Sequence, residues 1–148
     1  MAIGAQAVVV VAAVLAGLAP APGAVEPALA TRLRGIESAF KSGDAALLRP
    51  AFTGDGKVRV DLKNVMAGPG SYGPGQLKVI FDRIFDENLT REFTFRDEDV
   101  TESAGVAFAR GRWVHKVRPG GTVATDTLTF TLRQEGGDWR IHEIRSSR

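Results

Sequence analysis

The C-terminal part of the chain alternates apolar and polar residues over long stretches, and this alternation limits the fold more than any other feature. Phe93 and Phe95 alternate with polar residues in "REFTFRDEDV" (91–100), and the pattern returns in "GVAFARGRWVHKV" (105–117). A period of two residues is typical of a β-strand with one buried face. The stretches are separated by a Ser-Ala-Gly turn and by the hairpin signals "RPGGTV" and "EGGDW". The sequence therefore predicts an antiparallel meander from residue 91 onwards.

An amphipathic helix is predicted well before this meander. The segment "EPALATRLRGIESAFKSGD" (26–44) places Leu29, Leu33, Ile36 and Phe40 on one helical stripe. A proline falls in the first turn and a glycine follows the last one, which is the usual asymmetry of helix ends. This stripe needs an apolar partner, and the buried face of the meander supplies one.

Three shorter segments follow. "DAALLRPAF" (44–52) predicts a short second helix that Asp44 caps and Pro50 stops. "KVRVDL" (57–62) alternates apolar and charged residues, which predicts a half-buried strand. "AGPGSYGPG" (67–75) is rich in glycine and proline, so we expect a flexible connection there.

The main packing helix is predicted in "PGQLKVIFDRIFDEN" (74–88). A proline suits its first turn. Its polar side carries two oppositely charged pairs four residues apart, Lys78/Asp82 and Arg83/Glu87. Its broad apolar face consists of Leu77, Ile80, Phe81, Ile84 and Phe85.

Together these elements predict a single α+β domain, with the helices on one face of an antiparallel sheet. The 148 residues are 44% hydrophobic and 24% charged, which is the composition of one ordinary globular domain. The net charge of +2 and the absence of any charge run give no reason to expect a nucleic-acid partner. The chain has no cysteine, which excludes disulfides, thiol catalysis and cysteine-ligated metal.

The first residues predict export. Residues 2–25 carry no ionisable side chain, and their apolar centre (7–18) has the length of the hydrophobic region of a signal peptide. We expect residues 1–24 to be a signal, cleaved near Gly23 or Ala24, and residues 25–148 to form the periplasmic or extracellular domain. Cleavage after Ala30 fits the small-x-small pattern but cuts into the predicted helix. In the alternative, the segment stays uncleaved as an anchor and is the only part that contacts a membrane.

The length of one hairpin loop decides which residues share a face. A loop of two or four residues around Pro119 pairs positions whose numbers sum to an odd value. A loop of three residues buries Arg110 and Arg112 against the apolar positions of the next strand, and unpaired buried guanidinium groups are costly. The even loop is therefore predicted. Its inner face carries Ala107, Ala109, Gly111, Trp113, His115, Asp126, Leu128, Phe130 and Leu132.

This register makes Trp113, His115 and Asp126 neighbours at the polar end of the inner face. A carboxylate beside an imidazole orients the ring for a general base or for a polar ligand contact. The alternative is a structural hydrogen bond that closes the end of the core. His142, in contrast, is expected on the exposed outer side with Arg110 and the threonines of the opposite face.

Other candidates are weaker. Tyr72, the only tyrosine, either covers the mouth of a pocket beside Phe81 and Phe85 or anchors its loop. The acidic residues 97–99 indicate a solvated strand edge rather than a metal site. "GPGSYGPG" lacks the residues that phosphate-binding loops require. The sequence gives no reason to expect a metal or a cofactor.

The order "GIESAFKSGDAALLRPAF", "VRVDL", "YGPGQLKVIFDRIF" and "WRIHEIRSS" resembles the nuclear transport factor 2-like superfamily, and within it small exported bacterial domains of unknown function. The resemblance covers residues 28–147. It implies a strongly bent antiparallel sheet with the N-terminal helices packed in its concave face, an internal pocket, and homodimers formed through the sheet. Members that resemble steroid isomerases and polyketide cyclases carry an acid-base Asp or His in the cone, where only His115 and Asp126 are counterparts here.

Three functions are compatible with these features. We expect a non-catalytic domain that binds a small apolar ligand in its cone, or a dimeric interaction module. Ligand contacts then come from Trp113, His115, Asp126, Tyr72 and the helix residues Phe81 and Phe85. The enzymatic alternative is a cofactor-independent isomerase or cyclase that uses His115 as base and Asp126 to orient it.

Overall fold

The computed structural model describes residues 24–147. The predicted signal therefore lies almost wholly outside the described residues. Within residues 24–147, no helix is long and apolar enough to cross a membrane.

The elements are α2 (Pro27–Ser42), the 3-10 helix η1 (Ala45–Ala51), β1 (Val58–Asp61), β2 (Gly70–Tyr72), α3 (Pro74–Glu87), β3 (Asn88–Ser103), β4 (Val106–Val117), β5 (Val123–Glu135) and β6 (Asp138–Ser147).

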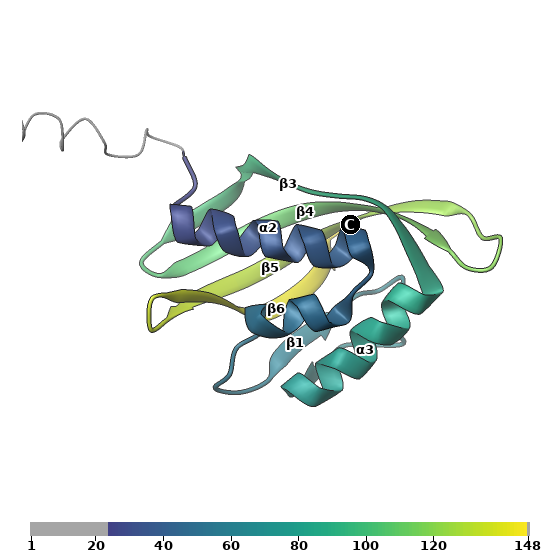
Figure 1. The fold of residues 1–148 in the computed structure, drawn as a ribbon, viewed down its shortest axis with the longest axis horizontal. Coiled ribbons are helices and arrows are strands. Elements are labelled where there is room, and N and C mark those ends of the chain that lie inside the picture. Colours follow the sequence, from purple (N-terminus) through teal and green to yellow (C-terminus); the bar gives the residue numbers. More distant parts are fainter. Residues whose placement is uncertain (1–23, 148) are drawn as a thin grey trace, which may run out of the picture.

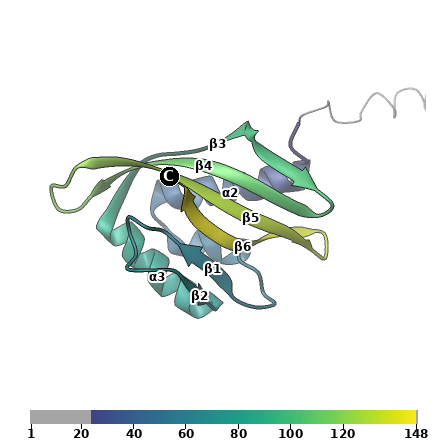
Figure 2. The same cartoon turned by 180° about the vertical axis from the view of Figure 1, so that it is seen from behind.

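The strands form one six-stranded sheet in the order β2-β1-β6-β5-β4-β3. The predicted meander makes up β3 to β6, and each of its neighbouring pairs is antiparallel. One pair departs from the prediction, because β1 lies parallel to β6. Figure 1 shows α2 and α3 on the same side of the curved sheet, and Figure 2 shows the sheet from its other side. The α+β class and the helices in the concave face are confirmed.

Helix α2 begins and ends as its sequence predicts. The carboxylate of Glu26 accepts hydrogen bonds from the backbone N–H groups of Ala28 and Leu29, at 3.2 and 3.1 Å. Gly43 ends the helix with a φ of 66°, a left-handed conformation that favours glycine. The indole of Trp139 also donates to Glu26, at 2.8 Å, and so ties the start of α2 to β6.

The segment after α2 differs in detail from the prediction. Asp44 caps it, accepting from the N–H of Ala46 at 3.0 Å. The helix is of the 3-10 type and does not stop at Pro50, because the N–H of Phe52 bonds to the carbonyl of Arg49 at 3.3 Å and closes the last turn. The missing N–H of the proline is therefore no obstacle at this position.

Strand β2 lies inside the stretch that the sequence predicts as a flexible connection. Its residues Gly70–Tyr72 pair antiparallel with β1, with Tyr72 opposite Val58. The ring of Tyr72 folds back over Gly70, where an added Cβ would lie 2.5 Å from Cζ of the ring. Only a glycine leaves room for the tyrosine ring there. A strand of three residues in a Gly/Pro-rich segment has no recognisable periodicity.

The register of β4 and β5 is the one predicted. Trp113 lies opposite Asp126 and Arg110 lies opposite Thr129, so the residue numbers of each pair have an odd sum. The N–H of Val117 bonds to the carbonyl of Thr122, which leaves a loop of four residues, 118–121. Arg110 and Arg112 are exposed. Both guanidinium groups therefore stay out of the core, as the sequence predicts.

Strand β3 contains the main irregularity of the sheet. Phe95 pairs with Gly111 and Val100 with Ala109, so residues 96–99 of β3 stand opposite Arg110 alone. Such a bulge bends its strand. Gly111 lies under the ring of Phe93, where an added Cβ would come 2.6 Å from the ring carbon Cζ.

Aromatic rings fill the concave side of the sheet. The ring of Phe40 on α2 stacks on Phe93 at a centroid distance of 4.2 Å. It also meets four further rings edge-on within 6.2 Å, those of Phe81, Phe85, Trp113 and Phe130. Phe81, Phe93 and Trp113 are at most 1% exposed. The space that the resemblance assigns to an internal pocket is thus occupied in large part by the side chains of the protein.

Candidate functional site

His115 and Asp126 form a buried hydrogen-bonded pair at the polar end of the inner face. Residue 115 lies on β4 and residue 126 on β5, and the register brings both side chains to the concave side. Nε2 of His115 lies 2.7 Å from Oδ2 of Asp126. The two side chains are only 1% and 9% exposed. The predicted neighbourhood of these residues is confirmed, whereas a catalytic or ligand-binding role stays a prediction.

Two asparagines complete the hydrogen bonds of the pair. Nδ1 of His115 lies 2.9 Å from Oδ1 of Asn88, whose amide nitrogen donates to the carbonyl of Ile84 at 2.9 Å. The amide of Asn64 donates to Oδ1 of Asp126 at 2.5 Å. Neither asparagine was predicted from the sequence, because Asn64 lies in a loop and Asn88 lies before the alternating stretch 91–100, so that each reaches the pair only through the tertiary fold.

These contacts determine where the protons lie. Because the amide nitrogen of Asn88 is used by Ile84, its oxygen accepts, and Nδ1 of His115 must carry a hydrogen. Nε2 is joined to the carboxylate of Asp126 by a hydrogen bond of 2.7 Å. Both ring nitrogens are therefore engaged by protein groups.

The imidazole is also covered on one face. The ring of Trp113 stacks on it with a centroid distance of 3.7 Å and an interplanar angle of 17°. The indole N–H of Trp113 donates to the hydroxyl of Thr90 at 2.9 Å, which fixes the tryptophan in turn. Such a fully satisfied and tightly packed polar group is typical of a structural hydrogen-bond network. Of the pair, only Asp126 lines a surface cleft, which has a volume of about 370 Å³. The cleft is lined by Lys63, Asn64, Thr125, Asp126, Thr127, Ser146 and Ser147.

The other residues predicted as ligand contacts, two on α3 and one on β2, lie in two different places. Phe81 and Phe85 on α3 point into the core, where both contact Phe40. Tyr72 is half-buried and lines a groove of about 540 Å³ between α3 and the segment from Val65 to Tyr72. We name this space the α3 groove. Its lining consists of Val65, Met66, Ala67, Gly68, Pro69, Tyr72, Ile80, Arg83 and Ile84.

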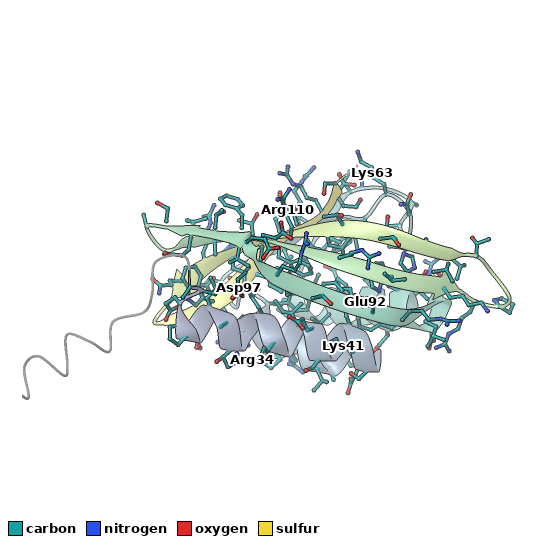
Figure 3. The ribbon with its side chains drawn as sticks, turned by 90° about the horizontal axis from the view of Figure 1, so that it is seen from above. Arg34, Lys41, Lys63, Glu92, Asp97 and Arg110 are labelled. Carbon is teal, nitrogen blue, oxygen red and sulfur yellow. The ribbon has the colours of Figure 1, made fainter. Side chains whose placement is uncertain are left out.

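The outer side of the sheet is polar and charged. Arg110 bonds to Asp99 at 3.1 Å, and Arg96 bonds to the same carboxylate at 3.2 Å. Arg112 lies 3.6 Å from Glu92. In Figure 3, Arg110 and Lys63 lie on one side of the molecule, while Arg34 and Lys41 project from α2 on the other. A cleft of about 600 Å³ lies among these ion pairs.

His142 is not the exposed residue that the sequence predicts. Its side chain is 28% exposed and contacts the carboxylate of Glu135, which also accepts from the hydroxyl of Thr53 at 2.8 Å. Burial raises the pKa of Glu135, but the hydrogen bonds from Thr53 and His142 outweigh it and lower the pKa below its ordinary value. The irregularity between Thr131 and Leu132 in the pairing of β5 with β6 accounts for this half-buried position.

The acidic residues 97–99 form no metal centre with other side chains. Asp99 is bound by two arginines, as described above. No group of three His, Asp or Glu side chains in residues 24–147 is arranged to hold a metal ion.

No protein-family model and no curated protein sequence matches the chain. Solved structures do. A DUF4783 family protein from Bacteroides uniformis ATCC 8492 is 16% identical with a TM-score of 0.63, over 78% of this chain and 94% of that one. An NTF-2 like protein of unknown function from Shewanella oneidensis MR-1 is 19% identical with a TM-score of 0.60, over 82% and 97%.

A third structure has a ligand. It is a hypothetical protein with a ketosteroid isomerase-like fold from Catenulispora acidiphila DSM 44928, in complex with trimethylamine. It is 12% identical, with a TM-score of 0.60, over 79% of this chain and 84% of that one. Likeness at this level of identity concerns the fold. The chain therefore has the nuclear transport factor 2-like fold, shared with bacterial proteins of unknown function.

Proposed function

We propose that this domain is non-catalytic and binds a small apolar ligand in the α3 groove. The observation that carries the proposal is the groove itself. Its volume of about 540 Å³ lies within the range of small-molecule sites, and aliphatic side chains such as Ile80, Ile84 and Met66 line it. The proposed site thus lies between α3 and residues 65–72, beside Tyr72, instead of on the concave side of the sheet.

The buried pair argues against catalysis. A general base needs a free lone pair within hydrogen-bond reach of its substrate. Both ring nitrogens of His115 are hydrogen-bonded, and the side chain is 1% exposed. A substrate can therefore reach the imidazole only if its hydrogen bond to Asn88 or to Asp126 breaks. The enzymatic alternative remains a proposal that needs such an opening.

Two variants of α3 test the ligand site. Ile80 lines the groove, whereas its neighbour Val79 is 67% exposed and lies outside the lining. We expect Ile80→Asn to weaken the binding of decanol, measured by isothermal titration calorimetry, because it places an amide in the apolar lining. Val79→Asn is the matched control, since it makes the same kind of change on the solvent side.

Native mass spectrometry of protein purified from its own host adds a second measurement. A retained small molecule that is lost in Ile80→Asn but kept in Val79→Asn supports the proposal. Equal binding by both variants and the wild-type protein, or no binding by any of them, contradicts it.

A homodimer through the outer side of the sheet is the second proposal. Phe108 is 48% exposed there, and the neighbouring charges alternate in sign, with Arg110 beside Asp99. An exposed aromatic ring among charges of both signs supports a contact between two copies related by a twofold axis. We expect Phe108→Glu to reduce the mass measured by analytical ultracentrifugation from that of a dimer to that of a monomer. A wild-type protein that is monomeric at all concentrations rules this proposal out.

A further inference from the structure

The α3 groove has one charged side chain in an otherwise apolar or neutral lining. Of the described residues that line it, Arg83 carries the only charge, and Tyr72 carries the only hydroxyl group. The aliphatic part of the lining suits a hydrocarbon chain, whereas the guanidinium suits a carboxylate or another oxyanion. A lining with both features favours an anionic amphiphile over a purely apolar molecule.

Arg83 is available to such a ligand. Its only ion pair among the described residues is with Glu87, one turn further along α3, at 3.0 Å. The two side chains are 79% and 50% exposed, and exposed pairs of this spacing stabilise a helix only weakly. A ligand acid group at the edge of an apolar groove competes for the same guanidinium at little cost.

Tyr72 gives the groove a fixed wall. Its ring lies against Gly70, and an added Cβ at that glycine would meet the ring carbon Cε2 at 2.9 Å. β2 is held by its antiparallel pairing with β1. The ring is thus positioned by the backbone of two strands, which favours binding because less freedom is lost when a ligand arrives.

We propose that the ligand of the α3 groove is an anionic amphiphile, whose acid group binds Arg83 at the edge and whose hydrocarbon chain lies along Ile80, Ile84 and Tyr72. This inference rests on the proposed function of the groove. It adds the chemical class of the ligand and the residue that selects it.

The first experiment compares three head groups on one ten-carbon chain. Decanoate and decyltrimethylammonium are titrated into the purified domain below their micelle concentrations, and decanol below its solubility limit. The dissociation constants are measured by calorimetry. We expect decanoate to bind about three- to fivefold more tightly than decanol, because an exposed charge pair contributes up to about 1 kcal/mol, and the cationic probe to bind most weakly. The preference for decanoate falls as salt is added, because the contact is exposed.

Two variants that each remove one exposed ion pair of α3 show whether the charge of Arg83 contributes to binding. Arg83→Gln and Lys78→Gln each remove one exposed ion pair of α3, with Glu87 and Asp82 respectively, but only Arg83 lines the groove. We expect Arg83→Gln to weaken the binding of decanoate by about the same three- to fivefold and to leave the binding of decanol unchanged, and Lys78→Gln to change neither. Glu87→Gln frees the guanidinium of Arg83, so we expect it to lower the dissociation constant of decanoate by about twofold.

Gly70→Ala supplies the complementary result. It displaces the ring of Tyr72 and so weakens decanoate and decanol alike. If decanol and decanoate bind equally and Arg83→Gln affects neither, the anionic class is refuted while the groove remains a ligand site. If neither probe binds to the folded wild-type protein, the groove itself is refuted and the inference falls with it.

Discussion

Replacing Asp126 by alanine tests whether the buried pair stabilises the fold. The change leaves Nε2 of His115 without a partner at a position that is 1% exposed. Removing one member of a buried charged or hydrogen-bonded pair costs about 3–5 kcal/mol. An unfolding entropy of about 2.1 cal/mol/K per residue converts each kcal/mol into about 4 °C for a domain of this size. We therefore expect Tm to fall by about 12–20 °C, measured by circular dichroism.

Two further variants complete this experiment. The double variant His115→Phe with Asp126→Leu removes both polar groups, so we expect it to recover more than half of the lost stability. Asp97→Ala is the control, because Asp97 is an exposed carboxylate on β3, and we expect it to change stability by less than about 0.5 kcal/mol. A loss below about 1 kcal/mol in Asp126→Ala, or a double variant as unstable as the single one, would refute the structural reading of the pair.

Three other predictions follow from the fold. The pKa of Glu135 is lowered, so this carboxylate stabilises the fold fully above its ordinary pKa of 4.5, and the stabilisation is lost as the pH falls through the lowered pKa. Glu135→Gln should therefore make Tm, measured from pH 7 down to acid pH, less dependent on pH. Gly111→Ala should destabilise by about 1–3 kcal/mol in urea unfolding because its Cβ meets Phe93, whereas Gly35→Ala, with open space around it, should stabilise by up to about 1 kcal/mol. A chain that begins at residue 24 should keep its full Tm, whereas one that begins at residue 31 loses the Glu26 cap and the buried Leu29 and should not fold cooperatively; equal melting of the two would contradict this.

The sequence was sufficient for those features that a local period determines. The stripe that includes Leu29 and Phe40, the alternation in β4, and the burial cost of Arg110 each depend on a few neighbouring residues. Together they predict the helices, the meander and the register that joins His115 to Asp126. The even length of the loop follows from the same cost, since the other register buries guanidinium groups, whereas the choice of four residues over two does not.

Features that depend on contacts distant in the chain were not predictable in this way. The parallel pairing of β1 with β6 joins residues more than eighty positions apart, such as Val60 and Ile144. Asn64 and Asn88 reach the buried pair from a loop and from the end of a helix, and no periodicity marks them. The α3 groove depends on how residues 65–72 lie against α3, which a Gly/Pro-rich sequence does not specify.

The direct passage from α3 into β3 has a mechanical consequence. Glu87 ends the helix and Asn88 begins the strand, so no linker lies between them to absorb a displacement. Asn88 holds Ile84 on one side and the ring of His115 on the other. The carbonyl of Glu87 is held by the N–H of Arg118, in the loop after β4, at 2.8 Å. The end of α3 and the buried imidazole are therefore tied through one residue, and we expect a displacement of this end of the helix to disturb the hydrogen bond between Asn88 and His115.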